Sequence, residues 1–264
     1  MRKVVSRDGT TIAYEKAGEG PPLVLLGGGF RDHTVFDSLV PLLTPYCTTY
    51  VYDRRGRGES GDSPHYAIAR EVEDLTAVIE EAGGRAAVFG GSTGGILALE
   101  TALAGAGISR LALLEPPYRM PGHQRPAEDF SDRLDALLAQ DRRGEAAEFF
   151  LAELVGFSPE EIGHWKNSPM WAANEAMAHT LPYDTALCGD GRLPAERLAS
   201  LDVESVVISS ESTGGWLLAA AQATAAALPR GRHLALPGVW HKVPPEVLAP
   251  AVARFVTGAG PGTP

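Results

Sequence analysis

The sequence predicts an α/β protein with a mostly parallel central sheet, flanked by helices, and a helical cap inserted after the sixth strand. Short apolar segments alternate with helical patterns over 1–115 and again over 202–258, an order typical of parallel strands joined by crossover helices. Residues 116–201 contain helical patterns but no convincing strand, and such an insertion most simply covers the carboxyl ends of the strands. We therefore expect a core of 1–115 and 202–258, a cap of 116–201 and a disordered tail of 259–264.

The individual elements follow from the spacing of apolar residues and from turn signals. The expected strands cover 2–6, 10–16, 22–26, 48–53, 85–89, 110–114, 204–209 and 233–236. The expected helices cover 71–82, 95–106, 130–140, 145–155, 159–165, 171–179, 215–227 and 245–255. In parallel sheets the functional groups gather at the carboxyl ends of the strands. Here those ends carry 27–29, 53–57, 90–94 and Glu115.

The composition is that of an ordinary globular protein. Of the 264 residues, 44% are hydrophobic and 21% are charged, which suits one large domain with a buried core. The net charge is −10 and no stretch is markedly basic. Because nucleic acids and anionic membranes need clustered Lys and Arg, neither is expected as a partner. We expect a small-molecule substrate instead.

Neither a secretion signal nor a membrane helix is expected from this sequence. The first residues, MRKVVSRDGT, lack the apolar segment of a signal peptide, and no run approaches the ~18 apolar residues of a membrane helix. Cys47 and Cys188 are the only cysteines, too few for a disulfide framework or a cysteine-based zinc site. We therefore expect a cytoplasmic protein with no metal site.

The segment Gly90-Gly91-Ser92-Thr93-Gly94 has the pattern Gly-x-Ser-x-Gly between an expected strand and an expected helix. A serine on such a sharp turn projects its hydroxyl, and the small neighbours let strand and helix approach closely. The alternatives are a tight turn without chemistry or a phosphate-binding loop, but the glycine patterns of phosphate loops are missing at this strand. The context predicts that Ser92 is a nucleophile.

A serine hydroxyl is a weak nucleophile at neutral pH and needs a hydrogen-bonded base. His241 follows the last expected strand and precedes the last expected helix. This is the place of the third member in the chain order serine, acid, histidine. Position and order therefore predict that His241 is the base for Ser92.

Together these motifs resemble the α/β-hydrolase superfamily, of the capped serine hydrolase type, over nearly the whole chain. Besides the Ser92 turn, the segment Asp53-Arg54-Arg55-Gly56-Arg57-Gly58-Glu59-Ser60 is similar to the family's Asp-x-Arg-Gly-x-Gly-x-Ser segment. The C-terminal stretch, with Gly238-x-x-His241 followed by a closing helix, is similar as well. The resemblance implies the α/β-hydrolase fold and acyl-transfer or related chemistry without a cofactor.

The resemblance also implies an oxyanion hole, which binds the negative oxygen of the tetrahedral intermediate. The family has His-Gly after its third strand, and Gly27 stands here where that histidine is expected. Because the hole needs backbone amides and no side chain, its donors survive this change. We assign the amides of Gly29 and Thr93 to the hole; the alternative for 27–29 is a flexible turn.

The acid of the triad has two candidates. In the family it follows the seventh strand, where this chain has Ser212 and Thr213, and Glu211 lies one or two residues early. Glu115, directly after the sixth strand and before two prolines, is the other candidate, because some members of the fold carry their acid there. We favour Glu115; its structural alternative is an ion pair with Arg54 or Arg57.

The substrate site is expected to be apolar. Phe30 and Trp240 lie beside the oxyanion loop and the base in sequence, and Met170 and Trp171 follow a proline that breaks a cap helix. We predict a hydrolase for a small ester, thioester, lactone or amide that works through an acyl-enzyme. The alternatives are a cyclase, lyase or isomerase that uses Ser92 and His241 as acid and base, and a non-catalytic ligand-binding protein.

Overall fold

A mixed eight-stranded sheet is the centre of the computed structural model, which describes residues 1–123 and 125–258. The spatial order of its strands is β1-β2-β4-β3-β5-β6-β7-β8. β2 is antiparallel to both of its neighbours, and the strands from β4 to β8 run parallel. The strands are β1 (Arg2–Val5), β2 (Thr11–Ala17), β3 (Pro22–Leu26), β4 (Thr48–Tyr52), β5 (Ala86–Gly91), β6 (Ile108–Leu114), β7 (Glu204–Ser212) and β8 (Gly231–Val239). The predicted fold class is confirmed; the predicted tail, 259–264, lies outside the described residues.

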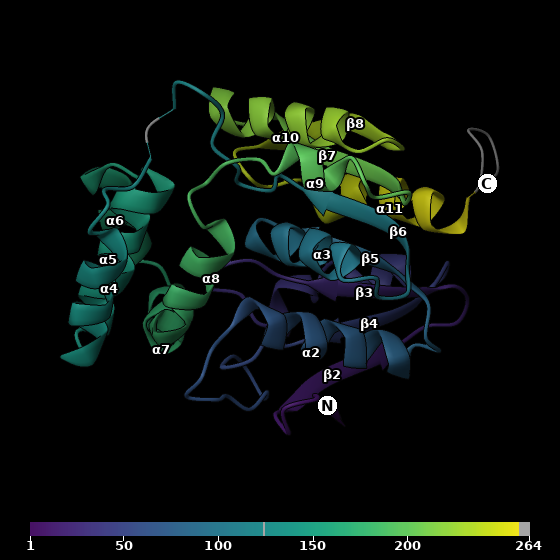
Figure 1. Cartoon of the computed structure of the whole chain (residues 1–264), viewed down its shortest axis with the longest axis horizontal. Helices are drawn as coiled ribbons and strands as arrows, with labels where there is room; N and C mark the ends of the chain where they lie inside the picture. The colour runs from purple at the N-terminus through teal and green to yellow at the C-terminus, as the bar shows by residue number, and fades with distance from the viewer. Residues whose placement is uncertain (124, 259–264) are drawn as a thin grey trace.

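Helices cover both faces of the sheet and extend beyond its edge (Figure 1). The α-helices are α1 (Val40–Leu43), α2 (Ile68–Glu81), α3 (Thr93–Leu103), α4 (Phe130–Ala139), α5 (Arg143–Phe150), α6 (Pro159–Lys166), α7 (Trp171–Met177), α8 (Leu181–Cys188), α9 (Ala195–Leu198), α10 (Gly215–Ala227) and α11 (Pro245–Thr257). Shorter 3-10 helices are η1 (His33–Phe36) and η3 (Ala178–Thr180), and η2 (Leu151–Val155) is a π-helix.

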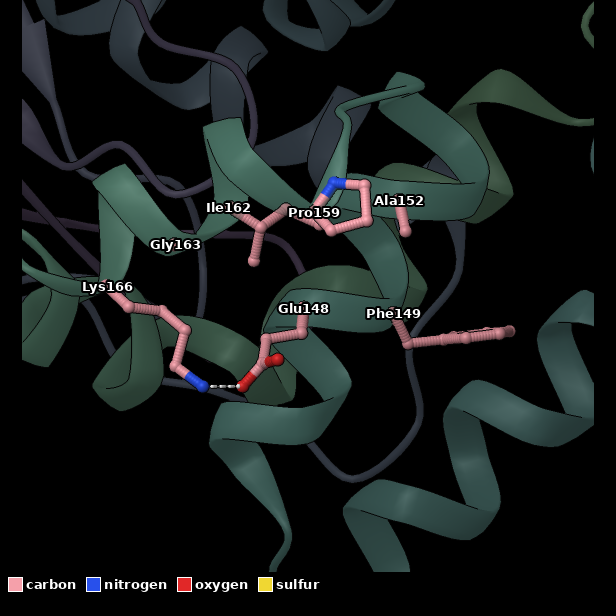
Figure 2. Close-up of a pocket in the computed structure, with 7 residues that line it drawn as sticks. All are labelled: Glu148, Phe149, Ala152, Pro159, Ile162, Gly163 and Lys166. Carbon is pink, nitrogen blue, oxygen red and sulfur yellow. Dashed lines mark hydrogen bonds and ion pairs between the residues drawn. The ribbon is translucent and has the colours of Figure 1, made fainter.

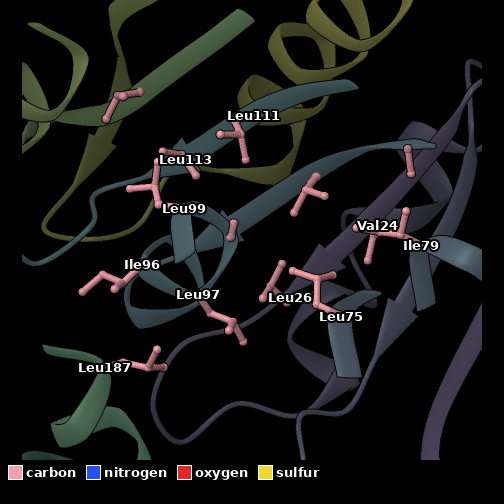
Figure 3. Packing of buried hydrophobic residues seen from close by; sticks show 14 of the residues in the cluster. Val24, Leu26, Leu75, Ile79, Ile96, Leu97, Leu99, Leu111, Leu113 and Leu187 are labelled. Carbon is pink, nitrogen blue, oxygen red and sulfur yellow. The ribbon is translucent and has the colours of Figure 1, made fainter. Parts of the chain in front are cut away.

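The core consists of two apolar layers, one on each face of the sheet. Successive side chains of a strand point to opposite faces, so Val24 and Leu26 of β3 pack in one layer, whereas Leu23 and Leu25 pack in the other. The first layer includes α2, α3 and α10 and is seen in Figure 3. The second layer includes α1 and α11. These continuous apolar strands are typical of a parallel sheet that is buried on both faces.

The strand order has a topological switch point in the middle of the sheet. β3 lies between β4 and β5, so the chain that leaves β3 turns toward one edge, while the chain that leaves β5 turns toward the other. Ligand sites of open α/β sheets lie at such a point, outside the carboxyl ends of the strands. The loops that begin at Gly27 and Ser92 both start there.

The helices from α4 to α8, which we call the helical segment (residues 130–188), have an apolar cluster of their own. In Figure 1 the group α4 to α7 stands beyond the end of the sheet, and α8 stands between this group and α3. Contacts of α8 with α2 and α3 join the helical segment to the core. Helix α9, in contrast, packs on α3 and α10.

Two departures from the expected helices concern this segment. The helix expected over 145–155 is α5 followed by the π-helix η2, which ends at Gly156 with a positive φ of 89°. Helix α8 was not expected at all. Its buried residues are Leu181, Asp184 and Leu187, so a carboxylate occupies the middle of the buried stripe and weakens the apolar pattern that predicts a helix. In the described part of the chain, no helix is both long and apolar enough to span a membrane.

Candidate active site

Ser92 occupies a sharp turn between β5 and α3. Its backbone has φ 55° and ψ −128°, a conformation that L-residues rarely adopt and that strand-to-helix turns with a nucleophile require. The turn closes tightly, because a Cβ at Gly90 would lie 2.5 Å from the carbonyl oxygen of Gly94. Thr93 is the first residue of α3, so its amide N–H has no carbonyl partner within the helix.

His241 and Glu115 meet at the carboxyl end of the neighbouring strand. His241 Nδ1 lies 2.7 Å from Glu115 Oε2, and the other carboxylate oxygen, Oε1, accepts a hydrogen bond of 2.8 Å from the Ser210 amide. Glu115 is fully buried. With Nδ1 held by the carboxylate, Nε2 of His241 makes no hydrogen bond to any described residue and is free to accept a proton.

Pairing between β5 and β6 brings Ser92 toward the pair of Glu115 and His241. Gly91 pairs with Leu114 across the two strands, so Ser92 and Glu115 are the next residues on adjacent strands. The amide of Ser92 donates to the Leu114 carbonyl at 2.9 Å. No hydrogen bond joins Ser92 to His241 in the described structure. Such a bond is often long in a free enzyme and tightens only when substrate binds.

The two candidate acids have different contacts. Glu211 is exposed near the end of β7, at the point where the pairing of β7 with β8 shifts register, and it makes no hydrogen bond to His241 among the described residues. Of the two carboxylates, Glu115 is the one that contacts His241. The ion pair of Glu115 with Arg54 or Arg57 does not form. Arg54 instead binds Glu71 through two bonds of 2.6 Å.

Backbone strain is concentrated at these positions. Among the described residues other than glycine, positive φ angles occur at Phe30, Ser92, Glu115, Asp141 and His241. Four of the five are residues that the sequence assigned to the site. Such conformations cost free energy and persist where the surrounding structure holds them, commonly at functional sites.

The loop after β3 packs directly on Ser92. A Cβ at Gly28 would lie 2.6 Å from Ser92 Cβ and 3.2 Å from Ser92 Oγ, so only glycine fits there. The neighbouring amide of Gly29 and that of Thr93 consequently both lie close to the nucleophile. These are the two donors that the sequence assigned to an oxyanion hole.

Arg57 holds this loop in the absence of the family's histidine. A Cβ at Gly27, where that histidine is expected, would lie 2.7 Å from Arg31 Cβ, so the position has no room for a larger side chain. Arg57 Nη1 instead donates to the Gly28 carbonyl at 2.6 Å. The loop 27–29 is therefore restrained by a buried guanidinium.

A second anchor holds the other end of the same loop. Asp53, fully buried after β4, accepts the amide of His33 at 2.7 Å and lies 2.9 Å from its Nδ1. Burial alone would lower the pKa of His33, but the Asp53 carboxylate outweighs it and raises the pKa above its ordinary value. This pair fastens the loop after β3 to the loop after β4.

The four residues assigned to the substrate site occupy different surroundings. Phe30 and Trp171 are buried in the apolar cluster of the helical segment, where Phe30 packs edge-on against Phe150 with ring centroids 5.6 Å apart. Met170 is 46% exposed. Trp240 is half-buried, with its ring centroid 5.5 Å from that of His241 and 4.9 Å from that of Phe157 in the helical segment. Phe30 and Trp240 thus lie where the core meets the helical segment.

A pocket lies within the helical segment itself (Figure 2). It has a volume of about 460 Å³ and is lined by residues of α5, η2 and α6, including Phe149 and Ile162, with the ion pair of Lys166 and Glu148 at one side. It contains none of the residues that the sequence assigned to the site. Elsewhere in 1–123 and 125–258, no group of three His, Cys, Asp or Glu side chains could hold a metal ion.

Comparison with known sequences identifies the class of protein that this fold and site define. The profile of the family described as "Alpha/beta hydrolase family" matches residues 23–255. The chain therefore belongs to the α/β hydrolase family.

Individual relatives agree with this assignment. An α/β hydrolase from Sphaerobacter thermophilus is 44% identical, with a TM-score of 0.93 over 96% of this chain and 99% of that chain. A thermophilic esterase from Thermogutta terrifontis has the same fold at 21% identity, with a TM-score of 0.71 over 96% of this chain and 95% of that chain. A pimeloyl-(acyl-carrier protein) methyl ester esterase from Vibrio campbellii is 35% identical over 94 residues, and the match spans just over a third of each protein, 36%.

Proposed function

We propose that the chain is a cofactor-independent serine hydrolase that cleaves a small, mainly apolar ester, thioester, lactone or amide through an acyl-enzyme. The contact of 2.7 Å between His241 Nδ1 and the buried Glu115 carboxylate carries the proposal. A buried acid that holds a histidine one strand away from a serine on a strained turn is the arrangement that activates a serine hydroxyl.

In the acylation step, Ser92 Oγ attacks the carbonyl carbon of the substrate while His241 Nε2 takes the hydroxyl proton. Glu115 keeps Nδ1 protonated and stabilises the imidazolium that forms. The carbonyl oxygen becomes an oxyanion and accepts hydrogen bonds from the amides of Gly29 and Thr93. Return of the proton from His241 to the leaving group then breaks the ester bond and leaves the acyl group on Ser92.

In the deacylation step, water takes the place of the leaving group. His241 accepts a proton from the water as the water oxygen attacks the acyl carbon. Collapse of the second tetrahedral intermediate returns that proton to Ser92 Oγ and releases the carboxylic acid. The same histidine therefore acts as base and then as acid in both halves of the cycle.

Several features support an apolar acyl substrate. Trp240 places an aromatic ring beside His241, and Phe30, next to the loop 27–29, packs in the apolar cluster of the helical segment. The helical segment contacts Trp240 through Phe157, consistent with a cap over the strand ends. The name of the Vibrio campbellii relative, a methyl ester esterase, supports an ester as one of the proposed substrates.

A fluorophosphonate probe tests the nucleophile directly. Intact-protein mass spectrometry should show one label on the wild-type chain, none on Ser92→Ala, and an undiminished label on Ser63→Ala, whose serine is half-buried in a loop away from the site. Equal labelling of the wild type and Ser92→Ala would show that Ser92 is not the nucleophile.

The reaction type is tested with 4-nitrophenyl esters of increasing acyl length. Burst release of 4-nitrophenolate, together with a mass increase equal to the acyl group, is the expected result. Turnover of a substrate without a trapped acyl-enzyme would instead favour a cyclase, lyase or isomerase. Complete silence with ligand-induced thermal stabilisation would favour a binding protein.

A further inference from the structure

Asp184, on α8 of the helical segment, is buried against both loops of the proposed oxyanion hole. It has no exposed surface. Its Oδ1 accepts hydrogen bonds from Thr93 Oγ1 at 2.6 Å and from Arg54 Nη1 at 2.7 Å. Its Oδ2 accepts one from Arg57 Nη2 at 2.6 Å. One carboxylate thus connects the helical segment to the nucleophile turn and to the loop after β4.

Asp184 affects the orientation of the Gly29 amide through Arg57 and the peptide group that joins Gly28 to Gly29. Arg57, held by Asp184, donates from Nη1 to the carbonyl oxygen of Gly28. That carbonyl and the N–H of Gly29 belong to the same planar trans peptide, so the two groups point in opposite directions. Fixing the carbonyl on Arg57 therefore aims the Gly29 N–H away from Arg57. The hydrogen bond also polarises the peptide and strengthens its N–H as a donor.

The bond to Thr93 acts on the second donor. Thr93 is the first residue of α3, and its side chain and its amide N–H share one Cα. A hydrogen bond of 2.6 Å to a buried carboxylate holds that side chain in one rotamer. Asp184 also lies beside Gly29, because a Cβ there would lie 3.3 Å from Asp184 Oδ2.

The positive charges of Arg54 and Arg57 offset the negative charge of Asp184, so this carboxylate does not repel an oxyanion nearby. Burial by itself would raise the pKa of Asp184, but the Arg57 and Arg54 guanidinium groups outweigh it and hold the pKa below its ordinary value. Arg54 is bound in turn by Glu71. Two arginines and two carboxylates thus form a buried neutral network, and Asp184 stays ionised without adding net negative charge beside the site.

We propose that Asp184 is a positioning residue that orients both oxyanion donors from the helical segment. It acts through Arg57 on the Gly29 amide and through Thr93 Oγ1 on the Thr93 amide. The hole is then correctly formed only when α8 is seated on the core. This inference rests on the proposed function, in which the two amides receive the oxyanion.

The test compares Asp184→Asn with Asp74→Asn. Asp74 is an equally buried carboxylate that binds Arg55 through two bonds of 2.7 Å, and no hydrogen bond joins it to either oxyanion loop in the described structure. With a 4-nitrophenyl ester, Asp184→Asn should lower kcat at least about 10-fold with KM within about two-fold. Asp74→Asn, assayed below its Tm, should keep kcat within about two-fold. Equal losses of kcat, or a loss confined to KM, would overturn the inference.

A second pair of variants covers the case in which Asp184→Asn does not fold. Thr93→Val keeps the backbone amide and the β-branched shape but removes the bond to Asp184, whereas Thr93→Ser retains a hydroxyl. The valine variant should lose kcat at unchanged KM, and the serine variant should recover at least about five-fold of that loss. Equal activity of the two variants would contradict the inference.

Amide hydrogen exchange provides a readout that needs no turnover. Asp184→Asn should accelerate exchange in the peptide that covers 27–31 and at Thr93, whereas Asp74→Asn should leave both as in the wild type. If the wild type cleaves no ester, the proposed function fails, and the exchange rates still decide whether Asp184 orders the loop. Unchanged exchange in Asp184→Asn would show that it does not.

Discussion

His241 Nδ1 lies 2.7 Å from Glu115 Oε2, and this contact joins the end of β6 to the loop after β8. Glu115 therefore reaches His241 from the strand next to the one that leads into Ser92. The amide of Ser210 on β7 holds the other carboxylate oxygen, so Glu115 is also supported by the strand after which the family's acid is expected.

Glu115→Gln should leave the fold intact and lower kcat roughly 10²- to 10⁴-fold, because an amide no longer holds the correct tautomer or stabilises the imidazolium. Steady-state kinetics with a 4-nitrophenyl ester measure the loss. The matched control is Glu211→Gln at the exposed end of β7, which should keep kcat within about two-fold. A large loss of kcat in Glu211→Gln and none in Glu115→Gln would show that Glu211, and not Glu115, is the acid.

Gly28→Ala should abolish most activity, because its Cβ would lie 2.6 Å from Ser92 Cβ. Moving the loop or the serine to relieve the clash costs about 1–3 kcal/mol of stability and displaces an oxyanion donor. Gly91→Ala is the control at the same turn, since a Cβ there meets nothing within 4 Å. Kinetics and urea unfolding of both variants test this prediction, which fails if they behave alike.

The pair of His33 and Asp53 should make stability depend on pH. Since the pKa of His33 is raised in the folded chain, the stabilisation is complete below the unfolded pKa of about 6.5 and is lost as the pH rises through the folded pKa. The Tm difference between the wild type and His33→Asn should therefore be larger at pH 5.5 than at pH 8.5. The exposed His65 supplies the control, because His65→Asn should show no such trend; a difference that grows with pH would reverse the sign of the argument.

Arg54→Met should destabilise the fold by about 3–5 kcal/mol, because it leaves Glu71 and Asp184 buried without their shared cation. Chemical denaturation measures the loss. Arg142→Ala, which removes the exposed pair with Glu145, should leave the midpoint nearly unchanged. Similar midpoints for the two variants would mean that the network of Arg54 adds little to stability.

Local patterns were enough to predict the elements that carry Ser92 and His241. Ser92 lies between a continuous apolar strand and a helix, and His241 lies between the last strand and the last helix, so both positions follow from residues near in sequence. The expected strands agree with the observed ones to within a few residues at most ends. The longer β7 is one exception, because pairing with β8 extends it past Ser209.

The identity of the acid and the role of Asp184 did not follow from local patterns. Glu115 and Glu211 both lie at strand ends, and only the register of the three strands β6, β7 and β8 shows which one reaches His241. Asp184 is 91 residues from Thr93 in sequence. The sequence around Asp184 does not show which residues it binds. Its place between Leu181 and Leu187 on the buried side of α8 is the one local sign that this carboxylate is buried.

The sequence by itself determined the fold class, the Ser92 turn and the position of His241, because spacing and turn geometry depend on neighbouring residues. Only the tertiary structure decided that Glu115 contacts His241, that Arg57 binds the Gly28 carbonyl and that Asp184 connects the helical segment to the Ser92 turn. Each of these contacts joins polar or charged groups that are far apart in the sequence. Burial makes them strong and selective, and burial is a property of the assembled chain.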